Sequence, residues 1–414
     1  MRDQKIVRGM GQSAQGKYKV MVVDSATEEV VYSSDWQKNL ILNQGMDGVS
    51  ARYWADCYVY GICGTGTRPN TVDSVTDTAS QSGTTVTKVG ANVDFTTDAE
   101  VGDMIKWDSG EEARITSLTG VNNVEVTPSQ TVASDEFVIY KTAQVGLQTE
   151  TKRSATYLTG TGNCGTTISG YTVQGRRTYD FTTESGSITY TEVGVGWAAS
   201  GPTTVFSRIL LTTPVSLVSG QKLRLVYQLE ITVSPATPNS KSFPVNGWPV
   251  APSTNTDGQE CIQVCGLSSP GTSGNTSVAT TQGACYASLD PGAVNSLTNG
   301  RAFGLSTNSS ALTAFDAAAA SRNTTAYQCS VAPTTAAYTS LSFYVDVSIV
   351  FQVADAVSSS LRSLCMGSRW NAVGQVPTDT VGQHFTFLFN QVQAKTNTQT
   401  LTFTVRITWS RVLA

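Results

Sequence analysis

Side chains that could carry acid–base or nucleophilic chemistry are few in this chain. It contains one histidine, His384, which any Ser/His/Asp or Cys/His catalytic unit would have to use. Its position at the head of an apolar stretch favours a packed or surface strand histidine instead. Residues 160–165 match the spacing of a dinucleotide-binding loop, but the residues after them break helices, and that chemistry needs a helix N-terminus at the pyrophosphate. We therefore expect no catalytic site and no bound cofactor.

The acidic side chains supply no pair suited to hydrolysis or to calcium. Glu111 and Glu112 are adjacent, so on a strand they would face opposite sides and could not flank one glycosidic bond. Asp73 and Asp77 lie in a threonine-rich stretch without the alternating ligands and the glycine of a calcium loop. We interpret these carboxylates as solvated surface groups.

The eight cysteines are too sparse for a disulfide scaffold. Cys261 and Cys265 have a spacing that zinc sites use, and Cys285 and Cys329 would be the further ligands, but this second pair is scattered. We expect no metal site. Disulfides among these four cysteines are the alternative that the sequence leaves open.

Tryptophan is the residue type most suited to recognition here. Five of the seven tryptophans lie near Gly, Asp, Asn or Pro, where an aromatic ring can stack on a sugar or anchor a loop. These five are Trp54, Trp107, Trp197, Trp248 and Trp370. The candidate contacts to a glycan or a partner protein are Trp107, Trp248 and Trp370.

The composition of the chain excludes some classes of protein and favours one class of secondary structure. Only 14% of the 414 residues are charged and the formal net charge is −4, which argues against a polybasic nucleic-acid coat and against binding to anionic membranes. No stretch approaches the roughly 18 apolar residues of a spanning helix, so we expect no membrane insertion. Low charge with abundant Thr, Val and Tyr favours strands.

Alternation of apolar and polar residues predicts long strands at three places, residues 223–233, 345–353 and 401–409. Residues 18–23 and 28–32, joined by a four-residue turn, predict a hairpin. Each strand has one apolar face, as in a sheet that covers a core on one side. The sequence therefore predicts a mainly β protein with a jelly-roll-like β-sandwich.

We assign the sandwich to residues 1–80, 143–235 and 341–414. Within it, we expect the strands at 341–353, 384–391 and 399–410 to complete a sheet begun at 205–233. Short helices are predicted at 36–48 and 314–321.

Two segments differ from the sandwich in composition. Residues 81–142 begin with a linker-like Ser/Gly/Thr stretch and continue as short strands separated by turns, with a hairpin around Asp108-Ser109-Gly110, which predicts an inserted SH3-like β-barrel. Residues 236–340 are rich in Pro, Ser, Thr, Asn and Gly, and we interpret them as a loop-rich excursion or a second domain.

Five short segments in this order resemble structural proteins of tailed-bacteriophage particles: 38–47, 60–67, 146–153, 192–197 and 206–208. The resemblance implies a β-sandwich without enzymatic activity, built into the virion after assembly in the host cytoplasm. It would belong to a tail, tail fibre or other appendage, and its partners would be copies of itself and other virion proteins. The alternative is an adhesin, or receptor-binding protein, that binds a host-surface glycan; a glycan-cleaving enzyme is a third hypothesis that no carboxylate pair favours.

Overall fold

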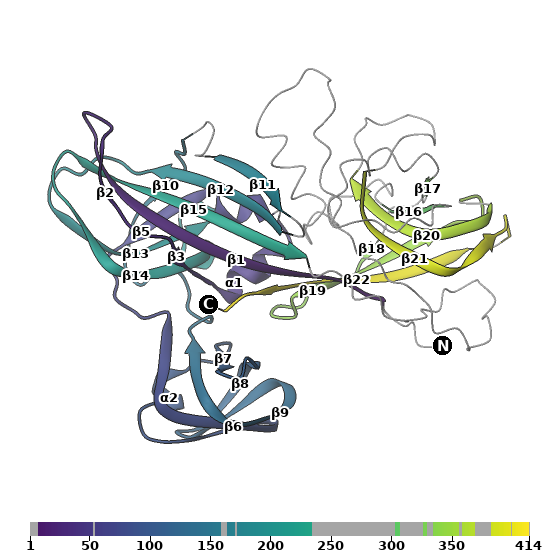
Figure 1. The fold of residues 1–414 in the computed structure, drawn as a ribbon, viewed down its shortest axis with the longest axis horizontal. Coiled ribbons are helices and arrows are strands. Elements are labelled where there is room, and N and C mark those ends of the chain that lie inside the picture. Colours follow the sequence, from purple (N-terminus) through teal and green to yellow (C-terminus); the bar gives the residue numbers. More distant parts are fainter. Residues whose placement is uncertain are drawn as a thin grey trace.

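Strands dominate the structure, a computed structural model in which residues 7–52, 54–158, 164–169, 172–233, 303–306, 326–328, 334–355, 358–368, 382–398 and 400–413 are described. Helix in this part of the chain is limited to α1 (Asn43–Val49), α2 (Phe95–Asp98) and the 3₁₀ turns Trp54–Tyr58 and Pro202–Thr204. The mainly β, sandwich-type fold predicted from the alternation is therefore confirmed. Its sheets occupy three regions, which Figure 1 shows as a sandwich, an insert and a C-terminal sheet.

The large sheet has nine strands in the order β11-β12-β15-β1-β22-β19-β18, with β2 and β3 also paired to β1. Its central strand, β1 (Val7–Asp24), pairs antiparallel with β15 (Gln221–Val233) and parallel with β22 (Leu401–Arg411). The predicted 18–23/28–32 hairpin is the β1–β2 pair. The other members are β2 (Val30–Ser33), β3 (Gln37–Lys38), β11 (Cys164–Ser169), β12 (Thr172–Asp180), β18 (Thr334–Thr335) and β19 (Tyr344–Phe351).

The second layer of the sandwich is a five-stranded sheet in the order β10-β5-β13-β14-β4. Each of the segments 38–47, 60–67, 146–153, 192–197 and 206–208 overlaps one strand of this sheet. The strands are β4 (Leu40–Ile41), β5 (Tyr60–Gly64), β10 (Glu150–Ser154), β13 (Ile188–Gly196) and β14 (Val205–Leu217).

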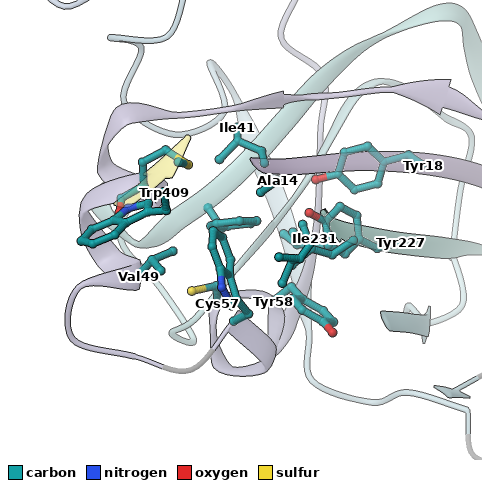
Figure 2. Packing of buried hydrophobic residues seen from close by; sticks show 14 of the residues in the cluster. Ala14, Tyr18, Ile41, Val49, Cys57, Tyr58, Tyr227, Ile231 and Trp409 are labelled. Atoms are coloured by element: carbon teal, nitrogen blue, oxygen red, sulfur yellow. The ribbon is translucent and has the colours of Figure 1, made fainter. Parts of the chain in front are cut away.

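An apolar core fills the space between the two layers. On β15 the odd-numbered residues from Leu223 to Ile231 are buried, while the even-numbered ones face away from the core, as the period-two pattern predicted. Figure 2 shows side chains of β1, α1, β15 and β22 pointing toward one another, with Tyr18, Tyr227 and Trp409 among them. This packing joins segments that are almost the whole chain apart.

The insert has a four-stranded sheet and a core of its own, and in Figure 1 it lies below the sandwich. Its strands are β6 (Thr71–Val89), β7 (Met104–Trp107), β8 (Glu112–Gly120) and β9 (Asn123–Tyr140). β9 pairs with β8, β7 and β6, and β7 pairs with β8, so the sheet curls into the small barrel-like unit that was predicted. The hairpin around Asp108-Ser109-Gly110 is confirmed as β7–β8.

The start of the insert differs from the prediction. The stretch at 80–85 lies inside β6 and is not a linker, and the sheet begins at Thr71. Three register shifts along the β6–β9 pair, the last between Gly83 and Thr85, interrupt the alternation by which a strand is identified.

The C-terminal strands do not complete one sheet as expected. β19 and β22 join the large sheet, but β21 (Gly382–Lys395) lies in a separate sheet with β20 (Ser358–Ser368), β16 (Phe303–Ser306) and β17 (Ala326–Gln328). The segment 205–233 is also divided, because β14 and β15 belong to opposite layers of the sandwich. A strand with one apolar face can belong to either sheet, so the alternation of apolar and polar residues did not show which strands share a sheet.

Of the two predicted helices, the first is shorter than expected. Only Asn43–Val49 is helical, because the residues before it form β3 and β4. The second, at 314–321, lies outside the described residues, as does most of the 236–340 segment.

Candidate functional site

A fully buried ion pair lies in the five-stranded sheet. Glu192 on β13 and Arg208 on β14 approach to 2.9 Å, and both side chains are 0% exposed. The adjacent strands place them together, since Gly194 pairs with Arg208 and Glu192 pairs with Leu210. A charge pair without solvent contact needs further hydrogen bonds to offset the loss of hydration.

The carboxylate of Glu192 obtains those bonds from three backbone amides. Its Oε1 accepts from the amides of Gly66 at 3.1 Å and Thr149 at 2.8 Å. Its Oε2 accepts from the amide of Gln148 at 3.1 Å and from Arg208 at 2.9 Å. Both oxygens are therefore satisfied twice by groups far apart in the sequence.

The amides belong to the two linkers of the insert, residues 65–70 before it and residues 141–149 after it. Arg208 also binds both linkers, because it donates to the carbonyl of Arg68 at 2.9 Å and to Gln144 Oε1. Burial lowers the pKa of Arg208 to about 10, so the guanidinium stays charged at neutral pH. We call this cluster the linker hub; it comprises Gly66, Arg68, Gln144, Gln148, Thr149, Glu192 and Arg208.

Packing in the linker hub explains why glycines occupy positions 64, at the end of β5, and 66, in the linker. A Cβ on Gly66 would lie 2.3 Å from Glu192 Oε1, and a Cβ on Gly64 would lie 2.3 Å from the carbonyl oxygen of Thr149. Only glycine allows the backbone to approach so closely. The two glycines are therefore explained by packing against the linkers, with no need for a bound ligand.

A second polar contact fixes the insert near α1. Lys141 Nζ lies 2.7 Å from Asp103 Oδ2, and the carbonyl of Gly102 accepts from Asn43 Nδ2 and Thr142 Oγ1, each at 2.8 Å. Burial raises the pKa of Asp103 despite the opposing effect of the lysine. An apolar seam accompanies these bonds, and its buried members are Leu40, Leu42, Ile62, Tyr140, Leu147, Val205 and Leu413.

The last strand is fixed to the same region. Trp409 Nε1 donates to the carbonyl of Met46 at 2.8 Å, and Arg411 donates to the carbonyl of Ile41 at 2.7 Å and to Asn43 Oδ1. Burial lowers the pKa of Arg411 to about 9. Together with the linker hub, these contacts connect the sandwich, the insert and the C-terminal strand β22.

Strand β2, which forms a hairpin with β1, carries three consecutive exposed apolar residues. Val30, Val31 and Tyr32 are 44%, 52% and 39% exposed. Among the described strands β2 pairs with β1 alone, so one edge keeps free backbone donors and acceptors. An uncharged edge strand of this kind is suited to pairing with another chain.

The outer face of the large sheet is polar, in contrast to the core face. Three neighbouring strands, β12, β15 and β1, present aligned rows of side chains that point away from the core. The register gives the rows Gln174–Glu230–Gln15, Arg176–Gln228–Lys17 and Thr178–Val226–Lys19. We call this surface the outer polar face.

Trp36 lies over the middle row of the outer polar face. The Lys17 ammonium is 5.4 Å from its ring centroid and the Arg176 guanidinium is 5.5 Å away. Lys17 belongs to β1 and Arg176 to β12, and these two strands lie on either side of β15. The indole ring therefore lies between the two cations, over Gln228 of β15. Gln228 is only 3% exposed, whereas Trp36 is 39% exposed.

The tryptophans selected from the sequence occupy other places. Trp107 is 1% exposed in the insert core, where its Nε1 donates to the carbonyl of Ala79 at 2.9 Å. The expectation that it contacts a glycan or partner is corrected, because alternation along β7 turns the ring inward. Trp248 and Trp370 lie outside the described residues. Trp36 was not among the tryptophans selected from the sequence. The sequence shows that Trp36 lies just after the predicted hairpin, one strand of which carries Lys at alternate, outward-facing positions.

The other residues considered for chemistry are dispersed or structural. Asp77 is buried, accepts from the amide of Val93 at 2.9 Å and lies 3.6 Å from Lys88 Nζ. Cys57 and Cys63 are buried, and burial raises the pKa of Cys63. Among the residues that the structure describes, no group of three or more His, Cys, Asp or Glu could hold a metal ion. His384 lies on β21, which Figure 1 shows in the C-terminal sheet. The four cysteines considered for zinc or disulfides lie outside the described residues: Cys261, Cys265, Cys285 and Cys329.

Comparison with known proteins gave no match among protein-family models, curated proteins or solved structures. In the described portion, every helix is too short or too polar to cross a membrane.

Proposed function

We propose that this chain is a structural component of a tailed-phage virion, in a tail, tail fibre or other appendage. It would act by homo-oligomerisation and by docking to other virion proteins. The observation that carries the proposal is the linker hub, because segments resembling phage structural proteins converge there on a buried network that fixes two folded units to each other. Rigid positioning is what a repeated part of a particle requires.

The exposed margin supports the same proposal. Strand β2 offers an uncharged strand edge with exposed valines, and a neighbouring subunit would cover both. Low overall charge favours close subunit packing, since fewer ions lose hydration at each contact.

Electron microscopy tests this role directly. Particles purified from a lysate of infected cells that express this chain are labelled with an antibody raised against it. Label at one defined position on a tail or appendage is the expected result. Particles that contain none of the chain by immunoblot would remove the proposal.

The second candidate function is a host-surface adhesin, and a specific observation favours it. Trp36 presents a half-exposed indole above aligned polar side chains, which is an arrangement suited to a sugar. The two functions are compatible, since an outward-facing virion protein can carry both.

A further inference from the structure

We infer that Trp36 and the outer polar face form a binding site for a neutral hexopyranose glycan. The inference deepens the adhesin function and rests on it. It is carried by one juxtaposition: an exposed indole ring lies directly over a row of hydrogen-bonding side chains on a three-stranded surface.

The ring is held in place by its surroundings. Lys17 and Arg176 flank it at 5.4 and 5.5 Å, and Arg176 donates to Gln228 Oε1 from Nε at 3.2 Å and from a terminal nitrogen at 2.8 Å. Both cations and Gln228 come from the sheet, while Trp36 remains 39% exposed. A fixed ring loses little conformational entropy when a ligand stacks on it.

The neighbouring row supplies the polar half of the site. Glu230 Oε1 accepts from Lys17 at 2.9 Å, from Gln174 at 3.2 Å and from Gln228 at 2.8 Å. Strands in a sheet are about 4.8 Å apart, so the side chains along one row have a spacing similar to that of hydroxyls on alternate carbons of a pyranose ring. A pyranose has an apolar C–H face for the indole and a rim of hydroxyls for these groups.

The two cations beside Trp36 already have partners. Lys17 is paired with Glu230 at 2.9 Å, and Arg176 donates to Gln228 Oε1 at 2.8 Å. A nucleic acid or a highly sulfated polysaccharide would have to compete with these contacts. A neutral glycan can instead accept from and donate to the same side chains without disturbing the pairs.

The test is a printed array of neutral and uronic-acid hexopyranose oligosaccharides, followed by calorimetric titration of the strongest binder. The full chain is compared with Trp36→Ala, Trp36→Phe and Tyr157→Ala. Tyr157 is the matched control, because it is 42% exposed and has a cation, Arg177, 5.6 Å from its ring, but pairs with Tyr179, whose side chain faces the core. Circular dichroism establishes that the variants are folded.

We expect binding to a neutral oligosaccharide that weakens about tenfold or more in Trp36→Ala, is largely retained in Trp36→Phe and is unchanged in Tyr157→Ala. The inference is overturned by lack of binding in the full chain, by equal binding in Trp36→Ala, or by binding confined to uronic acids and lost in high salt. Light scattering on the same samples reports the oligomeric state, so loss of the glycan site is distinguished from failure of the structural role.

Discussion

The linker hub makes a sharp prediction through Glu192→Gln. The substitution keeps the shape of the side chain but removes its charge, which leaves the Arg208 guanidinium buried without a counter-ion. An uncompensated buried charge costs about 3–5 kcal/mol. The carboxamide nitrogen also replaces one acceptor oxygen, so amides among Gly66, Gln148 and Thr149 lose their acceptor. We expect the free energy of unfolding to fall by about 4 kcal/mol.

Urea denaturation measures this loss, and hydrogen exchange with mass spectrometry locates it. The amides of Gly66, Gln148 and Thr149 should be protected in the wild-type chain and exchange much faster in Glu192→Gln. Glu28→Gln is the matched control: it also removes a carboxylate that contacts two cations, Lys222 and Arg224, but at an exposed position, so we expect no detectable change.

A double variant separates the burial of charge from other effects of substitution. Glu192→Gln combined with Arg208→Met removes both charges and keeps one acceptor oxygen for the linker amides, and we expect it to be more stable than Glu192→Gln alone. The reasoning would be refuted if Glu192→Gln lost less than about 1 kcal/mol, the value for an exposed pair. Unchanged protection of the linker amides would refute it equally.

Three further predictions concern the surface, the ion pairs and a buried thiol. Val31→Lys should weaken self-association measured by analytical ultracentrifugation, because it places a charge on the β2 edge. Val121→Lys, at an equally exposed turn of the insert, should leave self-association unchanged. If Val121→Lys weakened self-association and Val31→Lys did not, the β2 edge would be excluded as the contact between subunits. Burial raises the pKa of Asp180, but the hydrogen bonds from Arg224 and Lys222 together have a larger effect and lower it overall. Ionised Asp180 therefore stabilises the folded chain above the pKa that the group has in the unfolded chain, and this stabilisation is lost as the pH falls through the lower pKa of the folded chain. Asp180→Asn should therefore cost about 2 kcal/mol at pH 7 and much less near pH 2 in urea titrations, and a pH-independent cost would contradict the linkage. Cys63 should resist iodoacetamide at pH 8 in the native chain and react in urea, as peptide mass spectrometry would show; rapid native labelling would contradict its burial.

The long strands of the sandwich could be predicted because one face of each is uniformly apolar. On β19 the residues Val345, Val347, Ile349 and Phe351 are all buried, as alternation requires. β6 escaped the same reasoning. Its register shifts place extra residues in the strand, so the apolar positions no longer alternate, and its Ser, Gly and Thr content was interpreted as a linker.

The pairing of strands could not be predicted from local pattern. β1 lies beside β22, and no property of either strand alone selects a partner nearly 400 residues away. The candidate binding site depends on that kind of pairing. Lys17, Gln228 and Arg176 become one row only when β1, β15 and β12 are adjacent, so their outward-facing positions were visible in the sequence but their proximity was not.

Neighbouring sequence was also a poor guide to the tryptophans. Trp107 precedes an Asp-Ser-Gly turn, which suggested an exposed loop ring, but it is the last residue of β7 and its side chain faces the insert core. Trp36 lies just before a two-residue strand that pairs with β1, and this edge position leaves its ring above the sheet. The deciding factor is the face of the strand and not the nearest turn residue.

Buried and exposed charges are separated in a way that bears on function. Among the described residues, Asp103, Arg208 and Arg411 have pKa values shifted by burial, and each contacts groups at a junction between folded parts. Groups tuned for proton transfer would instead converge on a shared substrate position. Because these charges bind linkers and strand ends, their burial favours one arrangement of sandwich and insert over alternatives. The half-exposed polar side chains lie apart from them on the outer polar face, where a ligand can exchange for water without loosening the junctions that hold the chain together.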